Sequence, residues 1–374
     1  MVDILQTNPY ANYCAHKSEI DVAITRVLDS GRYIMGEEVS LFEKEFAEYV
    51  GVNYAAGVAS GTDALELALR ACGVGPDTIV FTVSHTAVAT VAAIERTGAE
   101  AVLVDIDPDT YNMDVNCLET AVLSSYNGRA TAIVPVHIYG HPAEMESIRK
   151  IADKNDLFVI EDCAQSHGAS KDGSRVGTMG HMGAFSFYPT KNLGALGDAG
   201  AVITDDIDLI DKVRRLREYG WTERYVSDIP GINSRMDPLQ AAILRVKLAS
   251  LDAENERRRL HAQRYCKMLH NSPVKIPYVQ KDVQHVYHQY VIQTAKRDEL
   301  RKHLLGLGIG TGIHYPVPVH KQPAYQGRVG SSGKLTNTEK VADRILSLPM
   351  YPELLSTEVD IVSDNVLDCE CLSD

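Results

Sequence analysis

Short apolar runs that alternate with helical segments are the feature of this sequence that most limits its possible folds. Strand-like runs cover residues 78–82, 101–105, 131–138 and 157–160. Apolar runs of this length are typical of strands that are buried on both faces of a sheet. Helical spacing follows them at short intervals, for example over residues 143–154. This alternation predicts an α/β fold, a mostly parallel sheet with helices on both faces.

The length of the chain sets its domain organisation. With 374 residues, the chain suits one large domain and a smaller one. We place the boundary in a long helix predicted for residues 238–269. The prediction is a large domain over residues 1–245, which begins with an extended arm over residues 1–18, and a small C-terminal domain over residues 246–374.

Composition excludes several classes of partner. The net charge of −13 argues against a nucleic-acid partner, because such a protein needs a basic face. The longest apolar runs fall short of the ~20 residues that a membrane helix needs, and we recognise no signal peptide. The 7 cysteines form no CxxC pair and no metal-like cluster with histidine. We therefore expect no metal, and reduced thiols in a cytoplasm.

A turn that follows a short strand is a candidate phosphate site. Residues 54–59 read as the strand, and Ser60-Gly61-Thr62 then opens a helix. Glycine lets the backbone approach a ligand closely, and the free N–H groups at a helix start attract an anion. The alternative is that Thr62 or Asp63 only caps the helix, and the two interpretations are compatible.

A lysine in an apolar connection is the candidate reactive group. Residues 184–204 read AFSFYPTKNLGALGDAGAVIT, and Lys191 lies between the two apolar ends of this stretch. Burial of a lysine lowers its pKa, so that the neutral amine becomes available to attack a carbonyl group. The alternative is a surface turn without a role. The flanking apolar runs favour function, because they place Lys191 in a connection between buried elements.

Four separated segments of the chain carry a family resemblance. SFYPTKNLG, with GDAG after it, resembles the cofactor-lysine segment of the DegT/DnrJ/EryC1/StrS family, which are sugar aminotransferases dependent on pyridoxal phosphate (PLP). SGTDAL, EDCAQSHGA and GINSRMDPLQAA resemble other segments of that family in the family's order, and the resemblance covers roughly residues 8–355. It implies the aspartate-aminotransferase type of fold (fold type I).

The resemblance implies roles for residues around the cofactor. Lys191 would carry PLP covalently, and the Ser186 hydroxyl would reach the cofactor phosphate together with the turn at Gly61 and Thr62. Asn233 would reach the phosphate of the neighbouring subunit, which implies a homodimer with shared active sites. The alternative for Asn233 is a turn residue before the next helix.

The face and edge of the cofactor ring have further candidates. Asp162, at the end of an apolar strand, would pair with the ring nitrogen, and Gln165 would lie near the ring or its phenolic oxygen. The alternatives are a helix cap for Asp162 and ordinary loop polarity for Gln165. Family members commonly carry an aromatic residue where this chain has Ala87, so we consider His85 as the stacking partner, or else as a helix cap.

The C-terminal part offers only weak candidates for contact with substrate. His314, Tyr315 and His320 either line the substrate side or take part in packing.

The implied reaction is the transfer of an amino group from glutamate to a keto-deoxysugar that is linked to a nucleotide. The segment REYGW, from residue 217, together with GINSRMD, from residue 231, looks closer to members that aminate a 3-keto sugar, which favours a dTDP-3-keto-6-deoxyhexose. The alternatives are a 4-keto sugar aminotransferase and a regulatory or binding member without turnover. A PLP-dependent sugar dehydratase of the same fold is disfavoured, because that branch replaces the lysine with histidine and this chain has Lys191.

Overall fold

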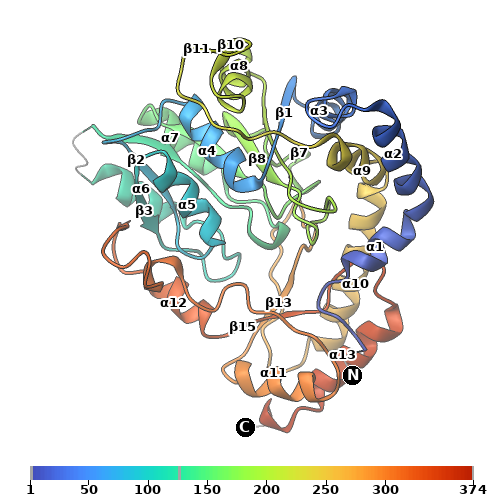
Figure 1. Cartoon of the computed structure of the whole chain (residues 1–374). Helices are drawn as coiled ribbons and strands as arrows, with labels where there is room; N and C mark the ends of the chain where they lie inside the picture. Colours follow the sequence, from blue (N-terminus) through green and yellow to red (C-terminus); the bar gives the residue numbers. More distant parts are fainter. Residues whose placement is uncertain (1–2, 125–127, 373–374) are drawn as a thin grey trace.

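The structure, a computed structural model, describes residues 3–124 and 128–372. A sheet with the strand order β1-β9-β8-β5-β4-β2-β3-β14 forms its centre (Figure 1). The strands in that order are β1 (Tyr54–Val58), β9 (Gly200–Thr204), β8 (Met182–Ser186), β5 (Phe158–Asp162), β4 (Ala130–Ile133), β2 (Ile79–Val83), β3 (Glu100–Val104) and β14 (Gly330–Ser331). Only β9 runs against its neighbours. The predicted mostly parallel α/β sheet is confirmed.

Helices cover both faces of this sheet. One face packs against α4 (Gly61–Ala71), α5 (Val88–Arg96) and α8 (Ile207–Leu216). The other packs against α3 (Glu37–Val50), α6 (Val115–Leu123), α7 (Met145–Lys154) and α9 (Pro238–Leu248). Successive side chains of a strand point to opposite faces. In β2, accordingly, Val80 packs on the face covered by α4, α5 and α8, while Ile79 and Phe81 pack on the face covered by α6 and α7.

A separate hydrophobic core lies beside the sheet and is built by the C-terminal part of the chain. It contains α10 (Leu251–Leu269), α11 (Arg297–Gly306), α13 (Ser356–Leu367) and the antiparallel pair β13 (Tyr290–Gln293) and β15 (Ile345–Leu348) (Figure 1). Ile4 also packs into this core, whereas β14 completes the edge of the large sheet. The domain boundary at residue 245 stays a prediction, and the outermost residues of the two ranges, 1–2 and 373–374, lie outside the described residues.

The remaining elements are short or lie at the periphery. They are α1 (Pro9–Ala15), α2 (Lys17–Ser30), α12 (Thr336–Ala342), β6 (Ser170–Lys171), β7 (Ser174–Arg175), β10 (Trp221–Glu223), β11 (Val226–Ser227), β12 (Val283–Gln284) and the 3-10 turns Ile138–Gly140, Val319–Lys321 and Glu370–Leu372. In the described ranges, every helix is too short or too polar to cross a bilayer.

Three predicted elements are wrong in detail. The strand-like run of residues 131–138 forms β4 only as far as Ile133, and a 3-10 turn begins at Ile138. The arm of residues 1–18 is not extended throughout, because Asn8 accepts a hydrogen bond from the Ala11 N–H and Pro9 occupies the first helical turn, so α1 forms there. The helix of residues 238–269 is broken at residues 249–250. Its halves bury their apolar faces in different cores, α9 against the sheet and α10 against α13, and this packing overrides local propensity.

Candidate active site

A cavity of about 240 Å³ lies at the carboxyl ends of β5 and β8, next to the start of α4. β1, β8, β5, β4 and β2 all run in the same direction, so their ends meet at this edge of the sheet. The sequence-predicted residues that line the cavity are Gly61, Thr62, Asp162, Gln165, Ser186 and Lys191. Segments far apart in the sequence therefore share one site.

The start of α4 forms a cradle for an anion. Ser60, rather than Thr62 or Asp63, is the cap, and its hydroxyl accepts the Asp63 N–H at 3.1 Å. In the described part of the chain, the N–H groups of Gly61 and Thr62 meet no acceptor. A Cβ at Gly61 would lie 2.5 Å from the Ser186 Cβ, so only glycine lets this turn approach β8. These free donors, with the Ser186 hydroxyl beside them, fit a phosphate group.

Lys191 lies in the connection between β8 and β9, as the sequence predicted. Burial lowers the pKa of its amine to about 8, although the nearby Asp162 carboxylate opposes this shift. The next residue anchors the connection, because the Asn192 amide donates to Asn255 Oδ1 at 2.8 Å and to the Val286 carbonyl at 3.0 Å. The connection is therefore anchored next to Lys191, whose amine loses its proton more readily than that of an exposed lysine.

Asp162 ends β5 and its side chain is buried. Burial raises the pKa of its carboxyl, and hydrogen bonds from Thr90 Oγ1 at 2.8 Å and from the Ala164 N–H at 3.1 Å oppose that rise. The charge of Lys191 acts in the same direction as these hydrogen bonds. The alternative role as a helix cap is wrong, because the element that follows is β6.

Gln165 is held in place by its own amide group. Its Oε1 accepts the Tyr139 N–H at 2.7 Å, and its Nε2 donates to the Tyr315 hydroxyl at 3.1 Å. One hydrogen of Nε2 remains for a ligand in the cavity. Tyr315 thus lies directly behind a cavity residue, whereas His314 binds the Ser347 hydroxyl at 2.8 Å.

Two predicted site residues lie apart from the cavity lining in this single chain. His85 is buried, and its Nε2 bonds to the Tyr139 hydroxyl at 2.7 Å. Ala87 itself lines the cavity, so stacking by His85 stays a prediction. Asn233 is exposed, while the neighbouring Ser234 donates to Asp63 Oδ2 at 2.8 Å. The Asn233 loop is therefore fixed against the first turn of α4, and its proposed contact with a partner stays untested.

The sequence did not identify several other cavity residues. Thr86, Thr90, Tyr188 and Asp198 line it as well. Tyr188 and Asp198 belong to the quoted lysine segment and Thr86 and Thr90 flank Ala87, but no spacing rule gives a hydroxyl or an exposed carboxylate a role of its own.

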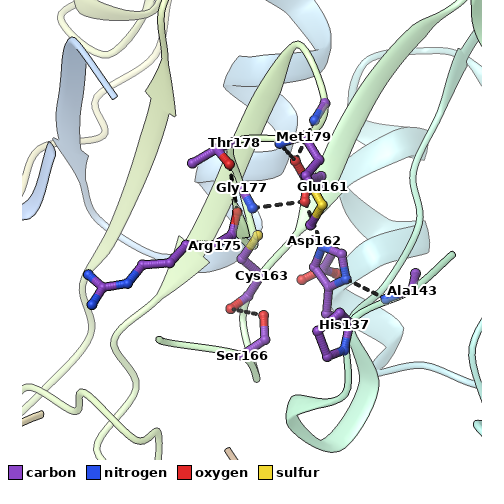
Figure 2. A network of polar contacts seen from close by, with 12 residues as sticks. His137, Ala143, Glu161, Asp162, Cys163, Ser166, Arg175, Gly177, Thr178 and Met179 are labelled. Carbon is purple, nitrogen blue, oxygen red and sulfur yellow. Dashed lines mark hydrogen bonds and ion pairs between the residues drawn. The ribbon is translucent and has the colours of Figure 1, made fainter. Parts of the chain in front are cut away.

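A buried polar cluster adjoins the site, and the sequence pattern missed it. The possible ligand atoms of His137, Glu161 and Cys163 lie within 4.8 Å of one another. Figure 2 shows that Glu161 lies between His137 and the turn at residues 177–180. His137 accepts the Ala143 N–H on Nδ1, so its Nε2 carries the proton that is donated to Glu161 at 2.8 Å.

The other partners of Glu161 are backbone amides. It accepts the N–H groups of Gly177, Met179 and Gly180 at 2.8, 2.8 and 2.5 Å. Hydrogen bonds thus use both nitrogens of His137 and both carboxylate oxygens of Glu161. A metal ion would have to break them, so the cluster works as a structural tie beside Asp162.

A parallel α/β sheet with a phosphate cradle, a lysine of lowered pKa and a strand-end aspartate at one edge defines a PLP-dependent enzyme of fold type I. The family model described as "DegT/DnrJ/EryC1/StrS aminotransferase family" matches residues 15–367. The chain belongs to this family. PLP is its cofactor, and the free donors at the start of α4 fit the phosphate of that group.

Individual relatives are similar to this chain over nearly its whole length. A dTDP-3-amino-3,4,6-trideoxy-alpha-D-glucose transaminase of Streptomyces venezuelae is 46% identical over 345 residues, which are 92% of this chain and 90% of that protein. A pleiotropic regulatory protein of Geobacillus stearothermophilus is 42% identical over 355 residues, 94% of each. The crystal structure of S. venezuelae DesV in complex with a ketimine intermediate matches with a TM-score of 0.94 and 44% identity, and the match covers 98% of each chain.

Proposed function

We propose that the protein transfers an amino group from glutamate to a nucleotide-linked keto-deoxysugar, specifically a dTDP-3-keto-6-deoxyhexose. The observation that carries this proposal is that Lys191 and Asp162 line the same cavity, whose edge is the anion cradle of α4. The dTDP-3-amino sugar named for the S. venezuelae relative supports amination at the 3-position. The resemblance carried by REYGW, which begins at Arg217, together with GINSRMD, which begins at Gly231, supports the same position.

Different residues of the cavity have different roles in the proposed reaction. Bound PLP supplies an electron sink for negative charge that develops on the donor Cα. The N–H groups of Gly61 and Thr62 and the hydroxyl of Ser186 bind its phosphate. Asp162 holds a proton on the ring nitrogen, and the Lys191 amine takes the proton from the donor Cα. A pKa of about 8 suits Lys191 to this task, because the free amine is then present near neutral pH.

We further propose that the protein is a homodimer with shared active sites. In one chain, Asn233 is exposed and its loop is tied to the phosphate helix through Ser234 and Asp63. An exposed amide at that place is suited to a phosphate that belongs to a partner subunit. Two smaller parts complete the proposal: a cytoplasmic location, which fits the free cysteines, and a division into domains at residue 245.

The shared site is tested by mixing two inactive variants, Lys191→Ala and Asn233→Asp. The new carboxylate would repel the cofactor phosphate in a partly desolvated site. If Asn233 serves the partner, each mixed dimer has one site with both substitutions and one intact site. Random exchange of equal amounts should then restore about a quarter of the wild-type activity. The measurement is turnover before and after subunit exchange.

Mass spectrometry of differently tagged subunits provides the control for this experiment, because it shows that mixed dimers have formed. Mixed dimers without any activity would mean that Asn233 acts within its own chain, and the shared-site proposal would be wrong.

The acceptor is tested by incubating the enzyme with glutamate and either dTDP-3-keto or dTDP-4-keto 6-deoxysugars. We expect amine product from the 3-keto series, with kcat/KM for the 4-keto series lower by at least about 10²-fold, since a misplaced carbonyl loses the reacting geometry. Product is identified by mass.

A preference for 4-keto sugars would favour the alternative 4-keto aminotransferase. The absence of turnover with both series would instead favour a regulatory role, the kind of role that the name of the G. stearothermophilus relative describes.

A further inference from the structure

A pair of threonine hydroxyls lies against the carboxylate of Asp162. Thr90 Oγ1 donates to Asp162 Oδ2 at 2.8 Å, and Thr86 Oγ1 lies 2.9 Å from Thr90 Oγ1. All of these side chains are buried, with exposed fractions of 1% for Thr90, 3% for Thr86 and 5% for Asp162. We propose that Thr90 is a positioning residue that keeps Asp162 ionised and correctly oriented, and that Thr86 in turn orders the Thr90 hydroxyl.

The direction of the hydrogen bonds follows from counting protons. An ionised carboxylate only accepts, so the single hydroxyl proton of Thr90 goes to Asp162. Thr90 Oγ1 must then accept from Thr86, whose own proton is used in that bond. The other oxygen of Asp162, Oδ1, accepts the Ala164 N–H at 3.1 Å. A proton on either oxygen would enter a place toward which a donor already points, so the arrangement favours the ionised form.

The carboxylate needs this support because burial acts against its charge. Burial raises the pKa of Asp162, and the hydrogen bond from Thr90 is the first of the effects that oppose the rise. The other charged or titratable groups near this carboxyl are Lys191, whose charge lowers its pKa, the imidazole of His137, the Cys163 thiol and the Tyr315 hydroxyl. Hydrogen bonds to charged groups are stronger than those between neutral groups. The hydrogen bond from the Thr90 hydroxyl, at 2.8 Å against 3.1 Å for that from the Ala164 N–H, therefore supports the charge directly.

The elements that carry Thr90 and Asp162 hold the two side chains in a defined relative position. Thr90 lies in the first turn of α5 and Asp162 at the end of β5, so the contact joins a covering helix to the sheet edge that carries the site. The branched Cβ of threonine limits its χ1 rotamers, and the hydrogen bond to Asp162 selects among them. This inference rests on the proposed role of Asp162 at the ring nitrogen, and it adds the residues that keep Asp162 fit for that role.

The test compares Thr90→Val, Thr90→Ser and Thr86→Val in the full-length protein. Thr90→Val keeps the shape of the side chain but removes the hydroxyl, whereas Thr90→Ser keeps the hydroxyl. The carboxyl of Asp162 is titrated by ¹³C NMR after selective labelling of aspartate, and its signal is assigned by its loss in Asp162→Asn. In the holoenzyme, the ¹⁵N shift of ring-labelled cofactor reports the proton on the ring nitrogen.

We expect the pKa of Asp162 to rise in Thr90→Val, to stay near wild type in Thr90→Ser and to rise less in Thr86→Val. In Thr90→Val, kcat should fall about tenfold with little change in the KM for the amino donor, as for the loss of one hydrogen bond to a charged group. Less proton on the ring nitrogen should accompany that fall.

Thr82→Val is the matched control. Thr82 is equally buried and its hydroxyl donates to the Val134 carbonyl at 2.9 Å. We expect both this variant and Thr90→Val to have a lower Tm than wild type, but Thr82→Val should leave the pKa of Asp162 unchanged. If Thr90→Val does not fold, Thr86→Val alone decides, since it perturbs the same hydroxyl from one step further away.

An Asp162 titration that is the same in wild type, Thr90→Val and Thr86→Val would overturn the inference, whatever the activity of the variants. The proposed function fails in a different way. If the titration shifts as expected but Asp162→Asn keeps wild-type turnover, the threonines position Asp162 as inferred, and the role proposed for Asp162 in catalysis is wrong.

Discussion

Replacing Lys191 with alanine is expected to lower the rate of amino transfer by at least ~10³-fold while the protein still folds. The loss is large because the change removes both the attachment point of the cofactor and the proposed base. Folding should survive because the loop is held by the Lys191 N–H, which donates to the Tyr188 carbonyl, and by the side-chain amide of Asn192, and the substitution keeps both. The measurements are turnover, the circular dichroism spectrum, and peptide mass mapping after borohydride reduction of the wild-type holoenzyme.

Lys247 provides the matched control for this experiment. It is also buried, burial lowers its pKa to about 8, and its Nζ donates to the Gly194 carbonyl at 2.5 Å. A lowered pKa alone would thus not distinguish the two lysines, whereas the cavity does, because only Lys191 of the two lines it. We expect the reduced cofactor on Lys191 in wild type and in Lys247→Met. Finding it on Lys247 would contradict the whole site.

Asp162→Asn is expected to reduce kcat by about 10²-fold or more, because the amide cannot stabilise a proton on the ring nitrogen as a carboxylate does. Cofactor affinity should change much less, since the donors at Gly61, Thr62 and Ser186 stay in place. The measurements are the rate of the half-reaction with glutamate and the Kd of PLP.

Asp198→Asn is the control for charge in the same cavity, because Asp198 lines it but is exposed. Its effect on the half-reaction should be small. Near-normal turnover of Asp162→Asn would leave Asp162 with a structural role only.

The sequence predicted those parts of the molecule that depend on local pattern and chain order. Buried runs such as that of β5 indicate parallel strands, and the ends of such strands meet at one edge whatever the remaining packing. Asp162 could be placed at this edge from its position at a strand end, whereas the resemblance to the family assigned Gly61, Ser186 and Lys191 to the same site.

Contacts between elements could not be predicted in this way. The hydrogen bonds from Thr90 to Asp162 and from Gln165 to Tyr315 join residues 72 and 150 positions apart. They depend on how α5 and the C-terminal part pack against the sheet, and no residue pattern within one segment encodes this packing. The break at residue 249 has the same origin, because a continuous helical pattern gives no sign that its halves belong to different cores.

The anchoring of Asn192 has a consequence for the order in which the chain matures. Its amide is bound by Asn255 and by the carbonyl of Val286, which are 63 and 94 positions further along. While the ribosome is still making those residues, β8 and β9 can already form, but the side-chain amide of Asn192 still lacks these two hydrogen-bond partners. We therefore expect the loop that carries Lys191 to gain its final contacts only when residues 255 and 286 have been made, although the residues that line the cavity all precede residue 199.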